Sequence, residues 1–382
     1  MTKFTCADVG ASVTRYMSHA TSEIRYIPNN MVFVGGSDKV DLQPSTEQIE
    51  SALDLTITKK EKSDVFPCRV LIGEMATRYA SVNVTPSGLT TKTSQPINNV
   101  SIITSVALSL LGEESQDAIP VSLYVALPPV EVLSIRDKVK AQFLGEYTVT
   151  FNKLAGKEVR FKIIDVESYE ESFLASLSFM FSVDGIRKPL FEKYAKGNIL
   201  SLDIGASTTD LATITNRVYQ ERSGRTYKVG GNVVRTAVIN SIMAKFEGYD
   251  VPTDEADRAV REGRVLYGNE YVNVSDIVAE AKRLYAAEIV QRLQTYFTSI
   301  NIPVQNFRAI LVSGGGSMSS KYKTDDSAYV ETVASMTYYI TQELHKVCKT
   351  IAVEEYDEDP RTANIRGLYL RAQMDLRKKA KK

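Results

Sequence analysis

One short pattern that could do chemistry occurs twice in the sequence. Residues 8–12 read Asp-Val-Gly-Ala-Ser, and residues 203–207 read Asp-Ile-Gly-Ala-Ser. The first copy follows the hydrophobic run Phe4–Ala7 and the second follows Ile199–Leu202, and a stretch rich in β-forming residues comes after each copy. The pattern therefore predicts two strand–turn–strand hairpins, each with an aspartate at the end of its first strand.

Such hairpins suit the binding of phosphate groups. Glycine permits a sharp turn and a close approach of the backbone to a ligand, while loop N–H groups and hydroxyls donate to phosphate oxygens. An aspartate beside a phosphate repels it unless a cation such as Mg²⁺ lies between them, directly or through water. We therefore expect Asp8 and Asp203 to bind Mg²⁺, and two facing hairpins to hold a triphosphate from both sides.

A third pattern supports this interpretation. Residues 310–317 read Ile-Leu-Val-Ser-Gly-Gly-Gly-Ser, which predicts a strand that runs into a turn whose backbone can lie flat against a base, ribose or phosphate. One Asp-x-Gly alone is a common turn, and a glycine run alone is a flexible loop or the start of a helix, so the combination carries the argument. The sequence contains no G-x-x-x-x-G-K-[ST] and no G-x-G-x-x-G after its first strand, which disfavours a Walker-type NTPase and a dinucleotide-binding fold.

The elements expected around these motifs include strands and helices in both halves of the chain, which indicates an α/β class with mixed sheets. The predicted strands are 4–9, 13–17, 31–34, 70–73, 120–126, 147–151, 159–166, 198–203, 209–213, 227–229 and 309–313. The predicted helices are a short one after Gly73, then 100–111, 132–144, 170–183, 232–246, 253–263, 275–297, 327–351 and 365–377. The polar stretch 35–64 is expected to be an inserted lobe or a mobile loop.

Composition excludes several classes of protein. The 382 residues contain 46 Lys and Arg against 46 Asp and Glu, so the chain lacks the overall positive charge typical of nucleic-acid binding. The 3 Cys and 2 His are widely separated and form neither C-x-x-C nor H-E-x-x-H, which disfavours a disulfide framework and a zinc site. Asp8 interrupts a signal-peptide core, and the apolar stretch 121–133 is too short to span a bilayer. We expect a cytoplasmic protein with no membrane partner, and we interpret the basic tail 377–382 as a solvated chain end.

The order of the three motifs resembles the actin/sugar kinase/DnaK-type ATPase superfamily, and the resemblance extends over most of the chain. In that superfamily Asp8–Thr14 corresponds to the first phosphate hairpin, Asp203–Asp210 to the second, and Ser313–Ser317 to the adenosine loop. Glu171–Leu177 and Ala363–Tyr369 are similar to the two helices that join its lobes.

Within the superfamily the sequence resembles bacterial actins of the ParM type, which segregate plasmids. The stretches that carry this resemblance are 70–76, 123–128, 145–149 and 161–166, while 228–235 is similar to the turn and helix that follow the second hairpin throughout the superfamily. It implies an α/β, actin-like (ribonuclease H-like) fold with two related lobes around a nucleotide cleft. Lobe I is expected over 1–177 and 364–382, with a smaller inserted subdomain near 30–65, and lobe II over 178–363.

By this resemblance three carboxylates act in catalysis. Asp8 and Asp203 orient Mg²⁺ and its water shell, and Glu171 positions or activates the attacking water, with Glu167 and Glu170 as alternatives. The residues expected to bind the nucleotide are Gly10, Ala11, Ser12, Thr14, Gly205, Ala206, Ser207, Thr208, Gly230, Gly231, Lys282, Gly314, Gly315 and Gly316.

The first loop departs from the family pattern, because family members often place a lysine there. This sequence offers Ser12, Thr14 and Arg15 instead, which leaves the donor to the phosphates open. The second hairpin has Ala206-Ser207 where family members often have Gly-Gly or Gly-Thr.

The resemblance implies an ATPase that assembles into filaments, with ATP and Mg²⁺ as cofactors and GTP as an open alternative. The filament would segregate plasmid or phage DNA through a DNA-binding adaptor at a centromere-like site, without touching nucleic acid itself. Two alternatives are a small-molecule kinase of the same superfamily and an FtsA-like scaffold at the membrane. The latter rests on the faintly amphipathic stretch 368–376 before the basic tail.

Overall fold

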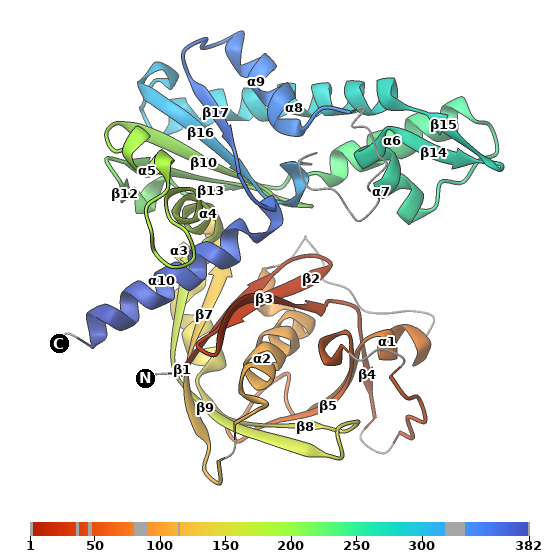
Figure 1. Cartoon of the computed structure of the whole chain (residues 1–382), viewed down its shortest axis with the longest axis vertical. Coiled ribbons are helices and arrows are strands. Elements are labelled where there is room, and N and C mark those ends of the chain that lie inside the picture. Colours follow the sequence, from red (N-terminus) through yellow and green to blue (C-terminus); the bar gives the residue numbers. More distant parts are fainter. Residues whose placement is uncertain are drawn as a thin grey trace. The chain divides into compact units, whose positions relative to one another are not determined.

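The computed structural model describes residues 3–35, 38–44, 48–79, 91–113, 115–317 and 333–380 (Figure 1). The chain divides into two compact units, which are described separately below. Unit 1 comprises Met1–Leu174, Val183–Gly185 and Asn364–Lys382, and unit 2 comprises Ala175–Ser182 and Ile186–Ala363. The chain thus leaves unit 1 after Leu174, where the sequence analysis placed a boundary after residue 177.

Unit 1 is built on a mixed sheet with the strand order β3-β2-β1-β7-β9-β8-β5-β6-β4. β1 is parallel to β7 and β7 is parallel to β9, whereas the other neighbours are antiparallel. Central parallel strands are apolar along their whole length because both faces are covered, and β7 is buried at every position except Pro120. The strands are β1 Lys3–Val9, β2 Val13–Ser18, β3 Thr21–Pro28, β4 Met31–Val34, β5 Ala52–Lys59, β6 Cys68–Gly73, β7 Ile119–Leu127, β8 Gly145–Phe151 and β9 Lys157–Glu170.

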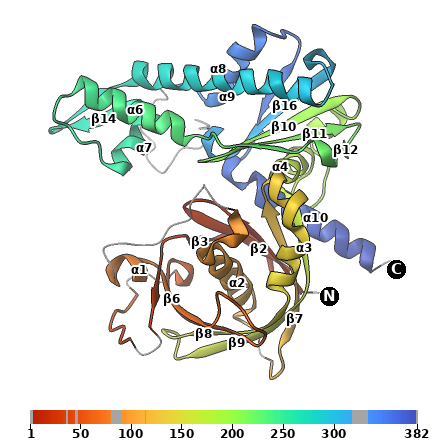
Figure 2. The same cartoon turned by 180° about the vertical axis from the view of Figure 1, so that it is seen from behind.

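One helix fills the curved side of this sheet. α2 contacts β1, β2 and β9, and both views show it inside the curl of the strands (Figures 1 and 2). It is therefore buried on almost every face, and its apolar residues join those of the sheet in a single core. The helices of unit 1 are α1 Glu74–Tyr79, α2 Pro96–Leu110 and α3 Pro129–Phe143, together with the start of α4 Glu171–Met180 and nearly all of α10 Ala363–Lys379.

Unit 2 has a second mixed sheet with the order β12-β11-β10-β16-β17, and β13 pairs with β11. Its strands are β10 Asn198–Ile204, β11 Thr209–Thr215, β12 Val218–Tyr219, β13 Arg225–Tyr227, β16 Phe307–Ser313 and β17 Ala352–Glu355, and β14 Arg264–Tyr267 and β15 Glu270–Asn273 form a separate hairpin. Its helices are α5 Pro189–Lys193, α6 Asn232–Lys245, α7 Thr253–Glu262, α8 Ser275–Ser299 and α9 Met336–His345. The central strands and the inner faces of α6, α8 and α9 share one core.

The same strand arrangement occurs once in each unit. In unit 1 the hairpin β1–β2 has β7 parallel beside β1, and in unit 2 the hairpin β10–β11 has β16 parallel beside β10. Asp8 and Asp203 occupy the same place in their units, one residue before the end of the first strand. The repeat in the sequence therefore reflects a repeat in the fold.

Most predicted elements are confirmed to within a few residues, and the differences lie where the sequence pattern is weak. The stretch 35–64, expected to be an insert or a loop, contains β5, which is hydrogen-bonded between β6 and β8 inside the sheet. β3 was not predicted because it is an edge strand with mostly exposed or half-buried side chains.

The helix expected over 327–351 is shorter than predicted. α9 begins at Met336 and ends at His345, and β17 follows it. The predicted start of that helix, 327–332, lies outside the described residues. No helix in the described part of the chain combines the length and the apolar composition needed to cross a bilayer.

Candidate functional site

The hairpin of unit 1 makes a tight turn directly after Asp8. The Gly10 N–H donates to the Val13 carbonyl at 3.0 Å, and a Cβ at Gly10 would lie 2.9 Å from that same oxygen. Asp8 lies opposite Arg15 in the β1–β2 register, and their side chains form an ion pair at 3.9 Å. The buried charge of Asp8 is thus offset within its own hairpin.

A buried asparagine fixes the shape of this turn. Asn29 donates its side-chain amide to the Gly10 carbonyl at 2.7 Å and its backbone N–H to the Ser12 carbonyl at 2.9 Å. Its Oδ1 accepts from the hydroxyls of Thr14 at 2.8 Å and Ser101 at 2.9 Å. Thr14, predicted to be a phosphate donor, is therefore a core residue whose hydroxyl is fully buried, whereas Ala11 and Ser12 are exposed at the tip.

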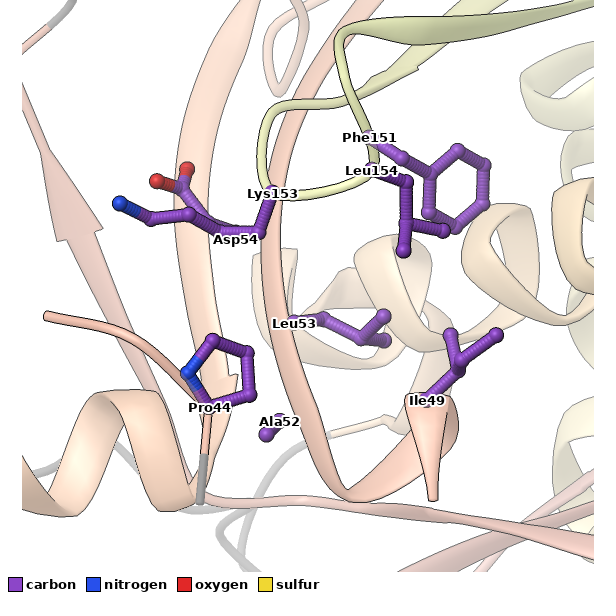
Figure 3. Close-up of a pocket in the computed structure, with 8 residues that line it drawn as sticks. All are labelled: Pro44, Ile49, Ala52, Leu53, Asp54, Phe151, Lys153 and Leu154. Carbon is purple, nitrogen blue, oxygen red and sulfur yellow. The ribbon is translucent and has the colours of Figure 1, made fainter. Parts of the chain in front are cut away.

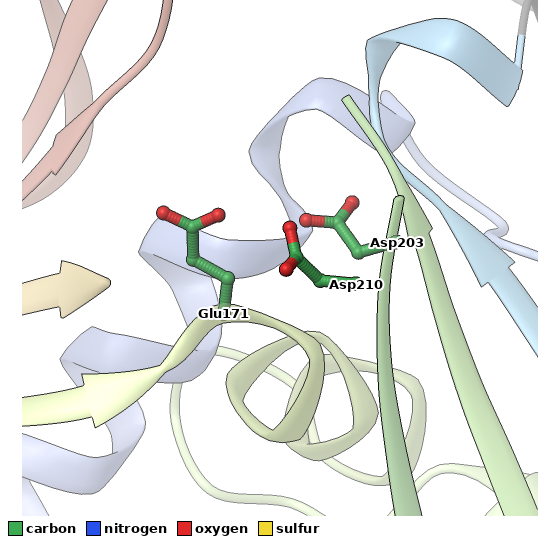
Figure 4. A group of neighbouring side chains, drawn as sticks. All are labelled: Glu171, Asp203 and Asp210. Carbon is green, nitrogen blue, oxygen red and sulfur yellow. The ribbon is translucent and has the colours of Figure 1, made fainter. Parts of the chain in front are cut away.

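The hairpin of unit 2 has the same turn but a different charge. Gly205 N–H donates to the Thr208 carbonyl at 2.8 Å, which closes a loop over residues 205–208. Asp203 lies directly opposite Asp210 in the β10–β11 register, where the first hairpin has an aspartate opposite an arginine. Both carboxylates are buried, and one oxygen of each lies within 4.8 Å of the other (Figure 4).

Hydroxyl groups orient this carboxylate pair. Asp210 accepts from Thr226 Oγ1 at 2.6 Å and from Thr208 Oγ1 at 3.2 Å, and Ser313 Oγ donates to Asp203 at 3.3 Å. These hydroxyls hold two buried carboxylates close together, an arrangement that suits a bound cation. A set of hard oxygen ligands suits Mg²⁺ or Ca²⁺ rather than a soft metal.

The glycine loop after β16 packs on the end of β10. Gly314 has a φ of +87°, and a Cβ there would fall well inside contact distance of the Ile204 carbonyl group and the Asp203 carboxylate. A Cβ at Gly316 would lie 2.6 Å from the Ile204 side chain and 2.7 Å from the Gly205 carbonyl oxygen. Gly314 and Gly316 thus bring the loop against Asp203, while Gly315 is exposed.

Gly230 and Gly231 hold the loop of the second hairpin from the other side. The N–H groups of Gly231 and Asn232 donate to the carbonyls of Gly205 and Ala206, both at 2.9 Å. A Cβ at Gly230 would lie 2.6 Å from the Ala206 carbonyl carbon. The start of α6 therefore shapes the loop through its backbone.

Lys282, predicted to contact the nucleotide, lies in the interior of unit 2. Its side chain is buried on α8, and its ammonium donates to the Ala334 carbonyl at 2.9 Å. This contact connects α8 to the chain before α9. The predicted contact of Lys282 with the nucleotide stays a prediction.

In unit 1, Glu171 is the first residue of α4 and directly follows β9 (Figure 4). Its carboxylate is buried and forms an ion pair with the ammonium of Lys92, whose side chain is 24% exposed. Burial lowers the pKa of Lys92, but the negative charges of Glu171, Asp8 and Glu131 raise it well above its usual value overall. The start of a helix also favours an ionised carboxylate at Glu171.

The two alternatives to Glu171 lie just before it in β9. Glu167 is partly exposed and lies 3.8 Å from the ammonium of Lys379. Glu170 is buried at the last position of β9, opposite Leu127 of β7. Glu171 differs from the other two carboxylates because it forms an ion pair with Lys92. The charge of Asp8 acts on the same ammonium group.

Two charged residues were not predicted from the sequence: Asp210 in the second hairpin, and Lys92, which pairs with Glu171. Asp210 had a usable signal, because a four-residue turn after residue 204 places residue 210 directly across from residue 203. Lys92 had none, since it is far from Asp8 and Glu171 in the chain and no motif surrounds it.

Unit 1 also has a separate pocket, whose described lining residues offer no cluster of carboxylates for a cation and no glycine loop for phosphate (Figure 3). It has a volume of about 160 Å³ and is lined mainly by apolar side chains, among them Ile49, Leu53 and Leu154. Asp54 at its edge accepts from Arg69 at 2.9 Å and Asn152 at 2.7 Å, so its charge is neutralised inside the fold.

Comparison with known proteins identifies the fold. Residues 201–324 match the family described as archaeal actin homologue MreB-like, C-terminal. The solved structure of the actin-like protein Alp7A aligns with a TM-score of 0.71 and 16% identity, over 100% of this chain and 98% of that one. Ta0583, an archaeal actin homologue, aligns with a TM-score of 0.70 and 16% identity, over 98% of this chain and 99% of that one.

A ParM structure also aligns. The subunit of a 15-stranded ParM filament from Clostridium botulinum gives a TM-score of 0.68 and 14% identity, over 98% of this chain and 99% of that one. Other structures with this fold include Ta0583 in complex with ADP and Bacillus thuringiensis ParM with ATP. A comparison with curated protein sequences gives no match. The chain has the actin-like fold, which confirms the predicted fold class and the resemblance to ParM-type proteins at the level of the fold.

Proposed function

We propose that this protein binds and hydrolyses ATP with Mg²⁺ and assembles into actin-like filaments under the control of the bound nucleotide. The observation that carries the proposal is the buried pair Asp203 and Asp210, which lies under the Gly314–Gly316 loop in a chain with the actin-like fold. A buried pair of carboxylates, each of which accepts from a neighbouring hydroxyl, is a natural site for a hard divalent cation, and the nearby loops suit phosphates.

The residues of the second hairpin fit a magnesium ion. Asp203 and Asp210 would hold it, either directly or through water, and the hydroxyls of Thr226 and Ser313 keep their carboxylates oriented. When bound, Mg²⁺ neutralises phosphate charge and polarises the phosphoryl group. Asp8, whose charge Arg15 offsets, would contribute as an acceptor for metal-bound water, which refines its predicted role as a ligand.

The two hairpin loops would bind the phosphates. Their glycines allow the backbone to approach a ligand closely, and their N–H and hydroxyl groups are donors. In unit 1 these are Gly10, Ala11 and Ser12, and in unit 2 they are Gly205, Ala206, Ser207 and Thr208. Gly314, Gly315 and Gly316 would lie against the sugar and the α-phosphate.

Hydrolysis needs an acceptor for one proton. The oxygen of a water molecule bonds to the terminal phosphorus, the bond from that phosphorus to the bridging oxygen breaks, and the diphosphate leaves. We assign the proton to the Glu171 carboxylate, because it is buried, begins a helix and lies beside a cation. Positioned bases of this kind typically contribute about 10²–10⁴-fold in rate.

We further propose that the filament moves plasmid or phage DNA through a DNA-binding adaptor. Two things support this: the fold shared with a ParM filament, and the balanced charge of the chain, which offers no general electrostatic attraction for nucleic acid. Binding of ATP would favour the polymer, and hydrolysis would weaken it.

The test is assembly in solution. Purified full-length protein is mixed with Mg²⁺ and ATP, ADP or no nucleotide, and light scattering, phosphate release and negatively stained images are recorded together. We expect scattering that rises with ATP and decays as phosphate appears, and a Glu171→Gln variant whose polymers persist. Glu288→Gln, at a partly exposed carboxylate paired with Arg292 on α8, is the matched control and should behave as the wild type. ATP binding without polymers at any salt concentration would refute the filament and favour a small-molecule kinase or a scaffold.

A further inference from the structure

Lys92 is a cation placed among the acidic residues of unit 1. Its ammonium contacts the Glu171 carboxylate, and the negative charges of Asp8 and Glu131 act on it as well. We propose that Lys92 contacts the terminal phosphate of the bound nucleoside triphosphate and thereby lets the protein distinguish a triphosphate from a diphosphate. This inference rests on the nucleotide binding proposed above.

The first hairpin needs such a cation from elsewhere in the chain. Residues 10–13 contain no Lys or Arg, and Arg15 already forms an ion pair with Asp8 on the same hairpin, at 3.9 Å. A triphosphate brings several negative charges next to two buried carboxylates, Asp8 and Glu171. An ammonium in that position offsets the repulsion, and charge-assisted hydrogen bonds to phosphate are among the stronger polar contacts in proteins.

The backbone of Lys92 is fixed, so only its side chain has freedom to move. Its N–H donates to the buried carboxylate of Glu131 at 2.8 Å, and its carbonyl accepts from the Asn98 side chain at 2.8 Å. Both partners belong to helices of unit 1, α3 and α2. A lysine on a fixed backbone is a compact charge on a flexible stem, which can exchange one anionic partner for another nearby.

The exchange couples binding to catalysis. The terminal phosphate carries more negative charge than one carboxylate and competes with Glu171 for the ammonium. When Lys92 contacts the phosphate, Glu171 becomes available to accept a hydrogen bond from the attacking water. A diphosphate lacks the group that draws Lys92 away, so the pair with Glu171 persists.

The test compares two affinities in the full-length protein. Dissociation constants for a non-hydrolysable ATP analogue and for ADP are measured with Mg²⁺ for the wild type, Lys92→Met, Lys92→Arg and the control Lys140→Met. Lys140 is a half-exposed lysine of the same unit that pairs with Asp165. We expect Lys92→Met to weaken binding of the analogue by about tenfold or more and to change the affinity for ADP by less than about threefold. Lys92→Arg keeps the charge and should restore most of the difference.

Two further variants cover the case in which Lys92→Met fails to fold because it leaves Glu171 buried without its partner. Glu171→Gln alone frees Lys92 and should retain or strengthen analogue binding. The double variant, Lys92→Met with Glu171→Gln, removes both charges and should lose it. If Lys92→Met weakens binding of the analogue and of ADP equally, or changes neither, the proposed role of Lys92 is wrong. A wild type that binds neither nucleotide would refute the proposed function itself.

Discussion

Replacement of Gly314 by alanine tests how the glycine loop packs on the second hairpin. Gly314 has a φ of +87°, where an L-residue costs about 1–2 kcal/mol relative to glycine. Its Cβ would also lie 2.7 Å from the Ile204 carbonyl carbon, so backbone must move. Forcing extra atoms into a packed site costs about 1–3 kcal/mol. We expect Gly314→Ala to lower the free energy of unfolding by about 2–5 kcal/mol, the sum of these two costs.

Gly248 supplies a matched control within the same unit. It has a φ of +78°, and nothing lies within 4 Å of the Cβ that alanine would add. Gly248→Ala therefore carries only the backbone cost of about 1–2 kcal/mol. Urea unfolding followed by far-UV circular dichroism measures both variants, since the chain has no tryptophan to report by fluorescence. Equal destabilisation by the two substitutions would refute the argument that close packing at Asp203 and Ile204 requires glycine.

Three other substitutions test separate parts of the account. Asp210→Asn should weaken ATP binding by about tenfold or more in Mg²⁺ but retain or strengthen it in EDTA, where this carboxylate only repels phosphate; an equal loss in both would contradict a cation at that pair. Asn29→Ala should cost about 2–4 kcal/mol of unfolding free energy, because it leaves buried partners of the first turn without hydrogen bonds; a thermal melt like that of the wild type would contradict this. Burial raises the pKa of Asp165, but the ammonium groups of Lys140 and Lys379 lower it below its usual value overall. Its stabilisation is thus present above about pH 4 and lost as the pH falls through the lowered pKa, so Asp165→Asn should cost about 1 kcal/mol or less at pH 7 and progressively less as the pH falls to 3. An unfolding difference that stays the same at both values would count against the pairing.

Much of the fold could be predicted because its signals are local. The runs before Asp8 and Asp203 are apolar over several residues and end in glycine turns. This pattern is typical of buried strands. Most of α2 was also predictable, because an apolar run with few helix-breaking residues forms its second half. Such elements need little information from elsewhere in the chain.

The strands that escaped prediction depend on their neighbours. β5 lies in a stretch with many polar residues, and it becomes part of the sheet only because β6 and β8 pair with its two edges. β17 is four residues long and half-buried, too short for its alternation to stand out. In both cases tertiary pairing outweighs a weak local pattern.

The candidate site divides in the same way. Asp203 and the glycines of residues 314–316 follow from strand-end motifs, and Asp210 follows once the turn length is known. Lys92 reaches Glu171 only through the packing of α2 and α3, which hold its backbone, and no spacing in the sequence encodes that contact. For Thr14 the local motif was misleading. It suggested a donor to phosphate, but the hydroxyl is buried in the core and donates to Asn29.

The most direct test of the central claim is calorimetric titration of the full-length protein with ATP, in Mg²⁺ and again in EDTA. The account predicts saturable binding of one nucleotide per chain that weakens strongly when Mg²⁺ is removed, because Asp203 and Asp210 repel phosphate without a cation between them. Absence of binding in Mg²⁺, or binding of equal strength in EDTA, would contradict it.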